Sequence, residues 1–122
     1  MKYACLIYSN EADPKAHPDQ ASPEFQEMMT GYFSFTAEAE AAGVHVAGEA
    51  LESVASATSV QVRDGDVVTT DGPFAETKEQ LGGFYILECE TLDQAISWAA
   101  KIPHAATGTV EVRPVPNFDQ PG

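Results

Sequence analysis

Hydrophobic and polar positions divide the chain into four extended segments and two amphipathic ones. The extended segments are rich in apolar, β-branched or aromatic residues, as is typical of strands. They cover residues 2–8, 44–52, 82–90 and 108–116. Pro114 and Pro116 give the last segment the character of an edge strand, because proline has no N–H to donate to a sheet.

The first amphipathic segment predicts a long helix. Ser22 is a favourable N-cap, Pro23 suits the first helical position, and Gly43 suits the position just after the last turn. The residues expected to face a core recur at helical spacing. They are Phe25, Met28, Met29, Tyr32, Thr36 and Ala39.

A second helix is expected between Thr91 and Pro103. Thr91 and Gln94 have capping-box spacing, and Pro103 cannot continue a helix. The stripe expected to be buried consists of Leu92, Ala95, Ile96, Ala99 and Ile102.

Residues 58–71 (TSVQVRDGDVVTTD) predict a β-hairpin, because two alternating runs flank a two-residue Asp-Gly turn. Pairing outward from the turn places Val62 opposite Val67. The two-residue period then puts Asp71 on the same face as Val67, where a hairpin normally carries an apolar residue.

This order of elements predicts an α+β fold, a ferredoxin-like βαββαβ arrangement with an extra β-hairpin, as one domain over residues 1–122. Residues 2–8 are apolar on both faces of the strand, and so are residues 84–89. Two helices cover only one face of a sheet, so the other face would stay exposed in a monomer. We therefore expect a two-fold homodimer that packs sheet on sheet.

Charge and composition exclude several classes of protein. The 122 residues carry a formal net charge of −13, which disfavours direct binding to nucleic acid or to anionic membranes. No apolar run approaches the length of a membrane span, and the N-terminal segment lacks the pattern of a signal peptide, so a cytoplasmic protein is expected. Cys5 and Cys89 lie in apolar runs and are expected to be buried and reduced.

Asp71–Glu79 reads DGPFAETKE, a short motif with three carboxylates and one lysine. With MKYACLIYSNE, AGVHVAGEALES and GTVEVRPV, it closely resembles the DGPF family, a branch of the YCII-related domains, over nearly the whole chain. The resemblance implies a ferredoxin-like fold and a dimeric α+β barrel. It also implies suspected enzymatic activity, because many YCII-like domains carry a characteristic histidine and aspartate. Here Asp71 can stand for the aspartate, but the first-helix region SPEFQEMMTGYF contains no histidine.

Asp71 and Lys78 are the candidate catalytic residues. Asp71 is interpreted as a partly desolvated general base, or as the start of an Asx turn. Lys78 can stabilise an enolate-like charge or receive a carboxylate, or it can pair with Asp71 or Glu76 as a structural cation.

Other candidates are assigned to substrate binding: Arg113, Glu76, His45 and Phe74. Tyr8, Tyr32 and Tyr85 are candidates for lining a pocket, core positions being the alternative. His17 and His104 are expected to be exposed. No metal site is expected, because His45 and Glu49 have no third ligand at a recognisable spacing, and no cofactor motif is found.

Two functions remain open from the sequence. The first is a cofactor-free enzyme that performs proton transfer, isomerisation or elimination on a small molecule, in a cleft near the DGPF motif. The second, implied by the fusion of family members to sigma-factor domains, is a non-catalytic dimeric module for ligand sensing or interaction, associated with transcription regulation.

Overall fold

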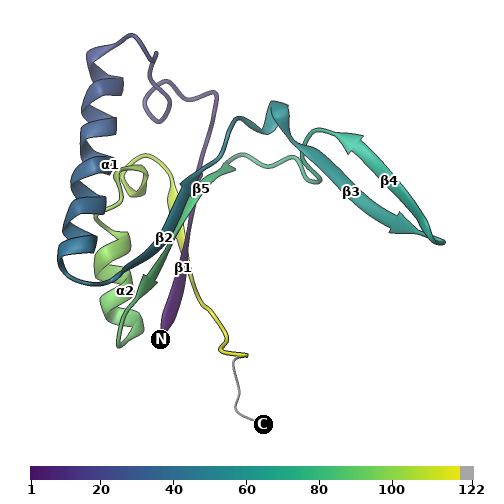
Figure 1. Ribbon diagram of the computed structural model, residues 1–122. Coiled ribbons are helices and arrows are strands. Elements are labelled where there is room, and N and C mark those ends of the chain that lie inside the picture. The colour runs from purple at the N-terminus through teal and green to yellow at the C-terminus, as the bar shows by residue number, and fades with distance from the viewer. Residues whose placement is uncertain (119–122) are drawn as a thin grey trace.

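The computed structural model describes residues 1–118 and contains a four-stranded sheet, a separate two-stranded sheet and two α-helices (Figure 1). In chain order the elements are β1 (Lys2–Ser9), α1 (Pro23–Ala41), β2 (His45–Ala50), the 3-10 turn η1 (Val54–Ser56), β3 (Thr58–Arg63), β4 (Asp66–Asp71), β5 (Gln80–Glu88), α2 (Leu92–Ala99), the 3-10 turn η2 (Pro103–Ala105) and β6 (Thr109–Pro114).

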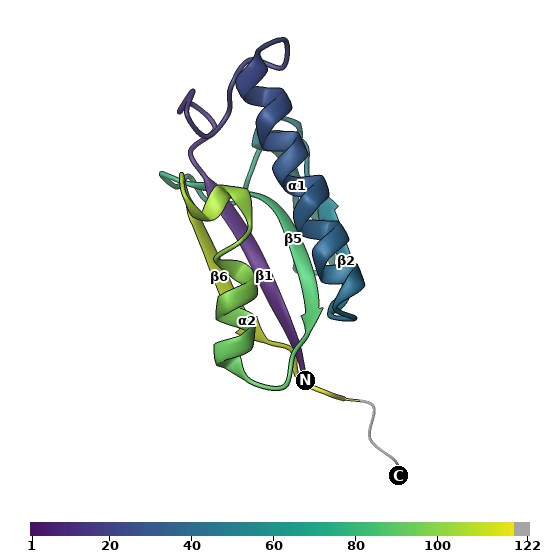
Figure 2. The same cartoon turned by 90° about the vertical axis from the view of Figure 1, so that its left-hand side faces the viewer.

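The main sheet has the strand order β2-β5-β1-β6, and each neighbouring pair is antiparallel. Both helices lie on the same face of this sheet, as Figure 2 shows. This is the ferredoxin-like arrangement, with β3 and β4 inserted between the second and third strands of the sheet. The predicted fold class is therefore confirmed.

The core lies between the sheet and the helices. The β1 residues Tyr3, Cys5 and Ile7 are buried there, together with Leu87 of β5 and Phe35 of α1. The alternate residues of β1 and β5 point to the helix-free face, where no element covers them, and are half-buried. They are Ala4, Leu6, Tyr8, Phe84 and Ile86.

Helix α1 begins and ends where its sequence predicts. The Ser22 hydroxyl accepts a hydrogen bond from the Phe25 N–H at 3.2 Å, and Gly43 adopts a positive φ of 73°. Of the stripe expected to face the core, only Ala39 is fully buried, and Phe35 joins it. The remaining residues of that stripe line a cavity instead.

Helix α2 is shorter than expected and ends at Ala99. Thr91 accepts from the Gln94 N–H, so the predicted N-cap is formed. The Gln94 side chain accepts from the N–H of Glu90 and not from that of Thr91, so the second bond of the expected capping box is displaced by one residue. The expected burial of Ala95, Ala99 and Ile102 is confirmed, whereas that of Leu92 and Ile96 is wrong, since both are about half exposed. The small side chains of Ala95 and Ala99 let the helix lie close to the sheet.

Strands β3 and β4 form an arm that extends away from the rest of the molecule (Figure 1). The predicted hairpin register is confirmed, with Val62 paired to Val67 across the Asp64-Gly65 turn. No strand of the main sheet pairs with the arm. Its apolar side chains are therefore largely exposed, 60% for Val62 and 69% for Val67.

Both cysteines are buried and free, as expected. Burial raises the pKa of the Cys5 thiol to about 11, with Cys89 as a second cause, and burial also raises the pKa of the Cys89 thiol. Both side chains therefore stay protonated and pack as small apolar groups. Among residues 1–118, neither helix is long and apolar enough to cross a membrane.

Candidate functional site

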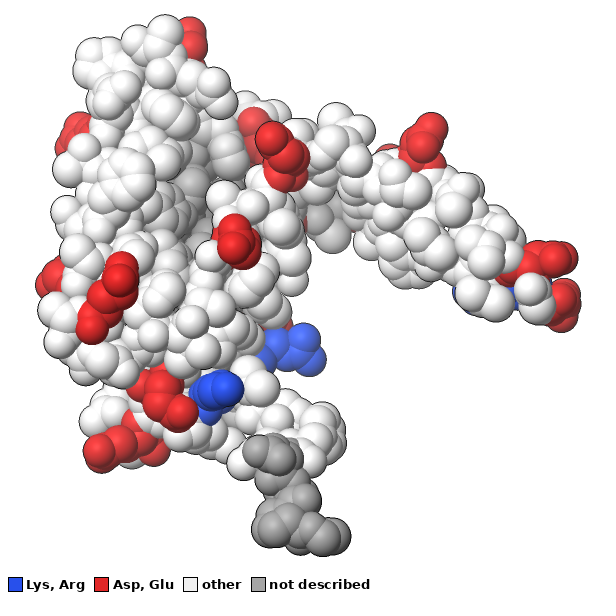
Figure 3. Space-filling view, viewed as in Figure 1, with Lys and Arg blue, Asp and Glu red and all other residues white. Residues whose placement is uncertain are grey.

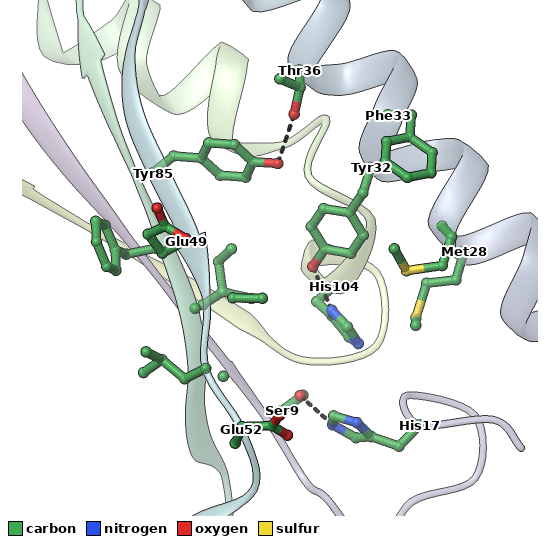
Figure 4. Close-up of a pocket in the computed structure, with 18 of the residues that line it drawn as sticks. Ser9, His17, Met28, Tyr32, Phe33, Thr36, Glu49, Glu52, Tyr85 and His104 are labelled. Carbon is green, nitrogen blue, oxygen red and sulfur yellow. Dashed lines mark hydrogen bonds between the residues drawn. The ribbon is translucent and has the colours of Figure 1, made fainter. Parts of the chain in front are cut away.

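A cavity of about 820 Å³ lies between the N-terminal half of α1 and the main sheet. On the helix side it is lined by Phe25, Met28, Met29 and Tyr32, and on the sheet side by residues of β2, β5 and the end of β1. Figure 4 shows Met28 and Tyr32 on the helix side of this space and Tyr85 reaching into it from the sheet. The stripe of α1 that looks like a core face in the sequence thus forms one wall of the cavity.

Glycines in the facing strands make room for this space. Gly48, Gly82 and Gly83 line the cavity and carry no side chains to fill it. At Gly48 an added Cβ would lie 2.6 Å from the ring of Tyr85, so only glycine lets this ring pack flat against β2. The ring is held at its other end by a 3.0 Å hydrogen bond between the Tyr85 and Thr36 hydroxyls.

Polar groups gather at one end of the cavity, in a histidine corner formed by Ser9, His17, Tyr32 and His104. Ser9, the last residue of β1, is 2% exposed, and its hydroxyl lies 2.7 Å from Nε2 of His17. Burial, and next the adjacent His104, hold the pKa of His17 below its ordinary value of 6.5, although Glu11 and Asp13 oppose the shift. His17 is therefore a neutral imidazole at neutral pH.

The hydrogen bonds of His104 define which of its two ring nitrogens carries the proton. Its Nε2 lies 2.7 Å from the carbonyl oxygen of Ala16, which can only accept, so Nε2 carries the proton. In the neutral ring, Nδ1 then accepts from the Tyr32 hydroxyl at 2.5 Å. Burial raises the pKa of Tyr32 well above its ordinary value, which keeps that hydroxyl protonated.

The two imidazoles stack on each other, with ring centroids 5.3 Å apart and planes inclined by 28°. The expectation that His17 and His104 are exposed is therefore wrong: His104 is 9% exposed and His17 is half-buried. The physical reason is the loop at residues 10–22, which folds back over η2 and places Ala16 and His17 against His104.

The DGPF motif lies outside the cavity. Asp71 is the exposed last residue of β4, and Phe74 is 81% exposed. The bend after Asp71 is held by the backbone of Gly72, which donates to the Ala57 carbonyl at 2.7 Å and accepts from the Ser59 hydroxyl at 2.8 Å. In the described residues the Asp71 carboxylate makes no hydrogen bond, so the predicted Asx turn is not formed.

The charged half of the motif is also in solvent. Glu76 and Lys78 are exposed, and within residues 1–118 Lys78 forms no ion pair, so the predicted pairing with Asp71 or Glu76 is wrong. Glu79 is the acidic residue of the motif that contacts the main sheet. Its carboxylate accepts a 2.9 Å hydrogen bond from the hydroxyl of Thr109, the first residue of β6.

The remaining candidates divide between the two faces of the sheet. Arg113 is exposed on β6 and paired in register with Ala4, which directs it to the helix-free face. His45 lines the cavity, edge-on to Tyr85 with ring centroids 6.0 Å apart. Among the candidate pocket tyrosines, Tyr32 and Tyr85 line the cavity and Tyr8 does not.

Sequence reasoning missed the histidine corner because its members are far apart in the chain. The sequence contains one weak indication of ordered histidines: His17 precedes Pro18, and His104 follows Pro103. The neighbouring proline restricts the backbone at both positions. In the described part of the chain, no group of three His, Cys, Asp or Glu side chains is placed to hold a metal ion.

Comparison with known proteins agrees with this fold. The chain is 34% identical over 117 residues to an uncharacterised protein of Rhizobium meliloti (strain 1021), R00369, covering 94% of this chain and 92% of the relative. The model of the YCII-related domain matches residues 1–119. The finer assignment to the DGPF branch stays a prediction. The chain belongs to the YCII-related domain family.

Proposed function

We propose that this protein is a cofactor-free enzyme that transfers a proton to and from a small organic molecule bound in the cavity, in an isomerisation or elimination next to a carbonyl. The observation that supports it most is His17, a neutral imidazole held by a buried serine at the end of an apolar cavity. A base whose pKa lies below neutrality is already unprotonated at physiological pH.

In this proposal His17 removes the proton. The 2.7 Å hydrogen bond to Ser9 orients the ring. The stacked His104 ring is held in place beside the base by its hydrogen bonds to Ala16 and Tyr32. Hydroxyls of the Thr36–Tyr85 pair, one of which keeps a free proton, are the donors available to a developing enolate oxygen.

The proposed assembly is a homodimer. The helix-free face of the sheet carries the apolar residues Leu6, Tyr8, Phe84 and Ile86, which are half-buried in the single chain. A second copy packed on this face would remove them from water, and a two-fold axis makes the contact self-complementary. Light scattering on the purified protein should then give twice the 13.0 kDa mass of one chain.

A base-sensitive probe tests the catalytic proposal. The uncharged bicyclic 5-nitrobenzisoxazole loses one C–H proton to a base while its N–O bond breaks and the electron pair leaves on oxygen as a coloured phenolate. We expect the protein to accelerate this elimination, with a pH profile whose midpoint lies below 6.5. The variant His17→Gln should lose about 10²-fold or more of the rate.

Two matched variants separate the alternatives. His45→Gln changes a histidine that also lines the cavity but is not bonded to Ser9, and it should keep most of the rate. If Asp71→Asn removes the activity while His17→Gln keeps it, the base lies in the DGPF motif. If the wild-type protein is no faster than an equal concentration of free imidazole, the catalytic proposal fails and the non-catalytic ligand-sensing module is favoured. Circular dichroism checks that each variant is folded.

A further inference from the structure

Within residues 1–118, no lysine or arginine side chain lines the cavity. The chain has six lysines and arginines, and none of them is among the lining residues. They are Lys2, Lys15, Arg63, Lys78, Lys101 and Arg113. The pKa of His17 is lowered, so this ring adds no positive charge near neutral pH. At the adjacent N-terminus of α1, Ser22 accepts the Phe25 N–H and Glu24 occupies the first turn, which offsets the helix dipole.

The charges that do line the cavity are carboxylates. Glu11 accepts hydrogen bonds from the Ser53 hydroxyl at 2.8 Å and the Val54 N–H at 3.1 Å, so donors partly offset its charge. Glu52 also lines the cavity, and within the described residues its exposed carboxylate makes no hydrogen bond or ion pair. Glu49 is paired in register with Phe84, which directs its side chain to the helix-free face. Figure 4 shows Glu52 beside Ser9, on the sheet side of the cavity, and in Figure 3 red acidic side chains lie beside the hollow between α1 and the sheet.

The rest of the lining is apolar, with side chains of Phe25, Met28, Met29 and Phe33 on α1. A bound anion would leave water without gaining any cationic partner, and it would lie near the carboxylates of Glu11 and Glu52. An uncharged ring system would bury its apolar surface against the same wall without that electrostatic cost.

We propose that the substrate of this site is an uncharged molecule with an apolar, ring-sized body, and that the cavity discriminates against carboxylates and phosphates. This inference rests on the proposed function, because a molecule bound in the cavity is a substrate only if the site is catalytic. It departs from the sequence-based idea that Lys78 or Arg113 receives an acidic substrate, because both residues lie outside the cavity.

Three probes of one shape test the proposal: 2-naphthylmethanol, 2-naphthylmethylamine and 2-naphthoate, titrated into the full-length protein by calorimetry. The alcohol should bind, the amine should bind at least as tightly, and the carboxylate should bind at least about tenfold more weakly than the alcohol. Added salt should narrow the gap between alcohol and carboxylate, because it screens the acidic wall.

The variant Glu52→Gln should also narrow the affinity gap between alcohol and carboxylate. Its matched control is Glu27→Gln, on an exposed position of α1 that does not line the cavity. Both variants change the net charge from −13 to −12, so only a local effect distinguishes them.

The proposal is overturned if naphthoate binds as tightly as the alcohol, if none of the probes binds, or if the control variant narrows the gap equally. Failure of the proposed function would give a different result. His17→Gln would then keep the rate of proton transfer, while the protein would still bind the uncharged probe more tightly than naphthoate.

Discussion

The main sheet and the arm are both built from antiparallel strands, yet they differ in what covers them. In the sheet, one face of β1 and β5 is packed against two helices, and residues such as Cys5 and Leu87 are fully buried. In the arm, every residue of β4 is exposed. An isolated two-stranded hairpin is marginally stable in water, so the arm depends on its attachment and on what covers it.

The attachment of the arm is specific. Glu11, in the loop after β1, accepts hydrogen bonds from Ser53 and Val54 at the start of η1, in the segment that enters the arm. The Glu11 N–H donates at 2.9 Å to the side chain of Gln80, which begins the strand that leaves it. These hydrogen bonds fix both ends of the arm beside the cavity. The direction in which the arm extends is therefore set by the main body, although no described element covers its apolar face.

The largest expected effect tests the buried side of this comparison. Phe35→Ala should lower the free energy of unfolding by about 3–5 kcal/mol, because Phe35 is 1% exposed and packs against Tyr85 and Trp98. The matched arm variant Val62→Ala should cost less than about 0.5 kcal/mol. Urea denaturation measures both. If the cost of Val62→Ala instead approaches that of Phe35→Ala, the arm is covered in solution.

An intermediate effect tests the proposed dimer. Leu6→Lys places a charge on the helix-free face and should weaken association by about 30-fold or more, as expected at a central interface position. If the arm also contacts the partner, Val62→Lys should weaken dimer association too, but by less than Leu6→Lys does. Gln61→Lys, on the opposite face of the same strand, is its control. A wild-type protein that stays monomeric at all concentrations in sedimentation would contradict the dimer.

The smallest expected effect concerns pH and the histidine corner. The pKa of His17 is lower in the folded chain than in the unfolded chain. As pH falls below about 6.5, the unfolded chain therefore binds a proton that the folded chain does not, and stability is lost. The wild-type protein should lose more stability than His17→Gln between about pH 7.5 and pH 5 in urea titrations. The neighbouring residues Glu11, Asp13 and His104 are present in both proteins, so the difference between the two stability curves reports on His17. An equal loss in both would show that this ring is not desolvated.

Local patterns were sufficient to predict the elements and the fold class. Ser22 and Gly43 bound α1, the Asp64-Gly65 turn fixes the register of the arm, and Thr91 caps α2, as read from neighbouring residues alone. Burial was harder to predict, because Leu92 and Ile96 have the spacing of a core stripe but the packing of α2 leaves them half exposed.

The cavity was not predictable in the same way. In the sequence, a helix face that lines a cavity has the same apolar spacing as one that packs in a core. For Met28 and Met29, the sign that they line a cavity is the set of glycines in the facing strands. The histidine corner depends on a contact between the loop at residues 10–22 and η2, which are some ninety positions apart, as in the bond from His104 to Ala16. The DGPF motif drew attention through its charge, whereas the side chains that line the cavity come from segments with no shared pattern.

The buried thiols have a practical consequence for measuring the arm. Cys5 and Cys89 are almost inaccessible, and at neutral pH they are not thiolates, the form that reacts with alkylating reagents. A single new cysteine at Thr69, which is exposed and pairs with Val60 on the face of Val62 and Val67, should therefore accept a spin label or a fluorophore selectively in the otherwise unaltered chain. The mobility of the label would report whether these valines meet water or another surface.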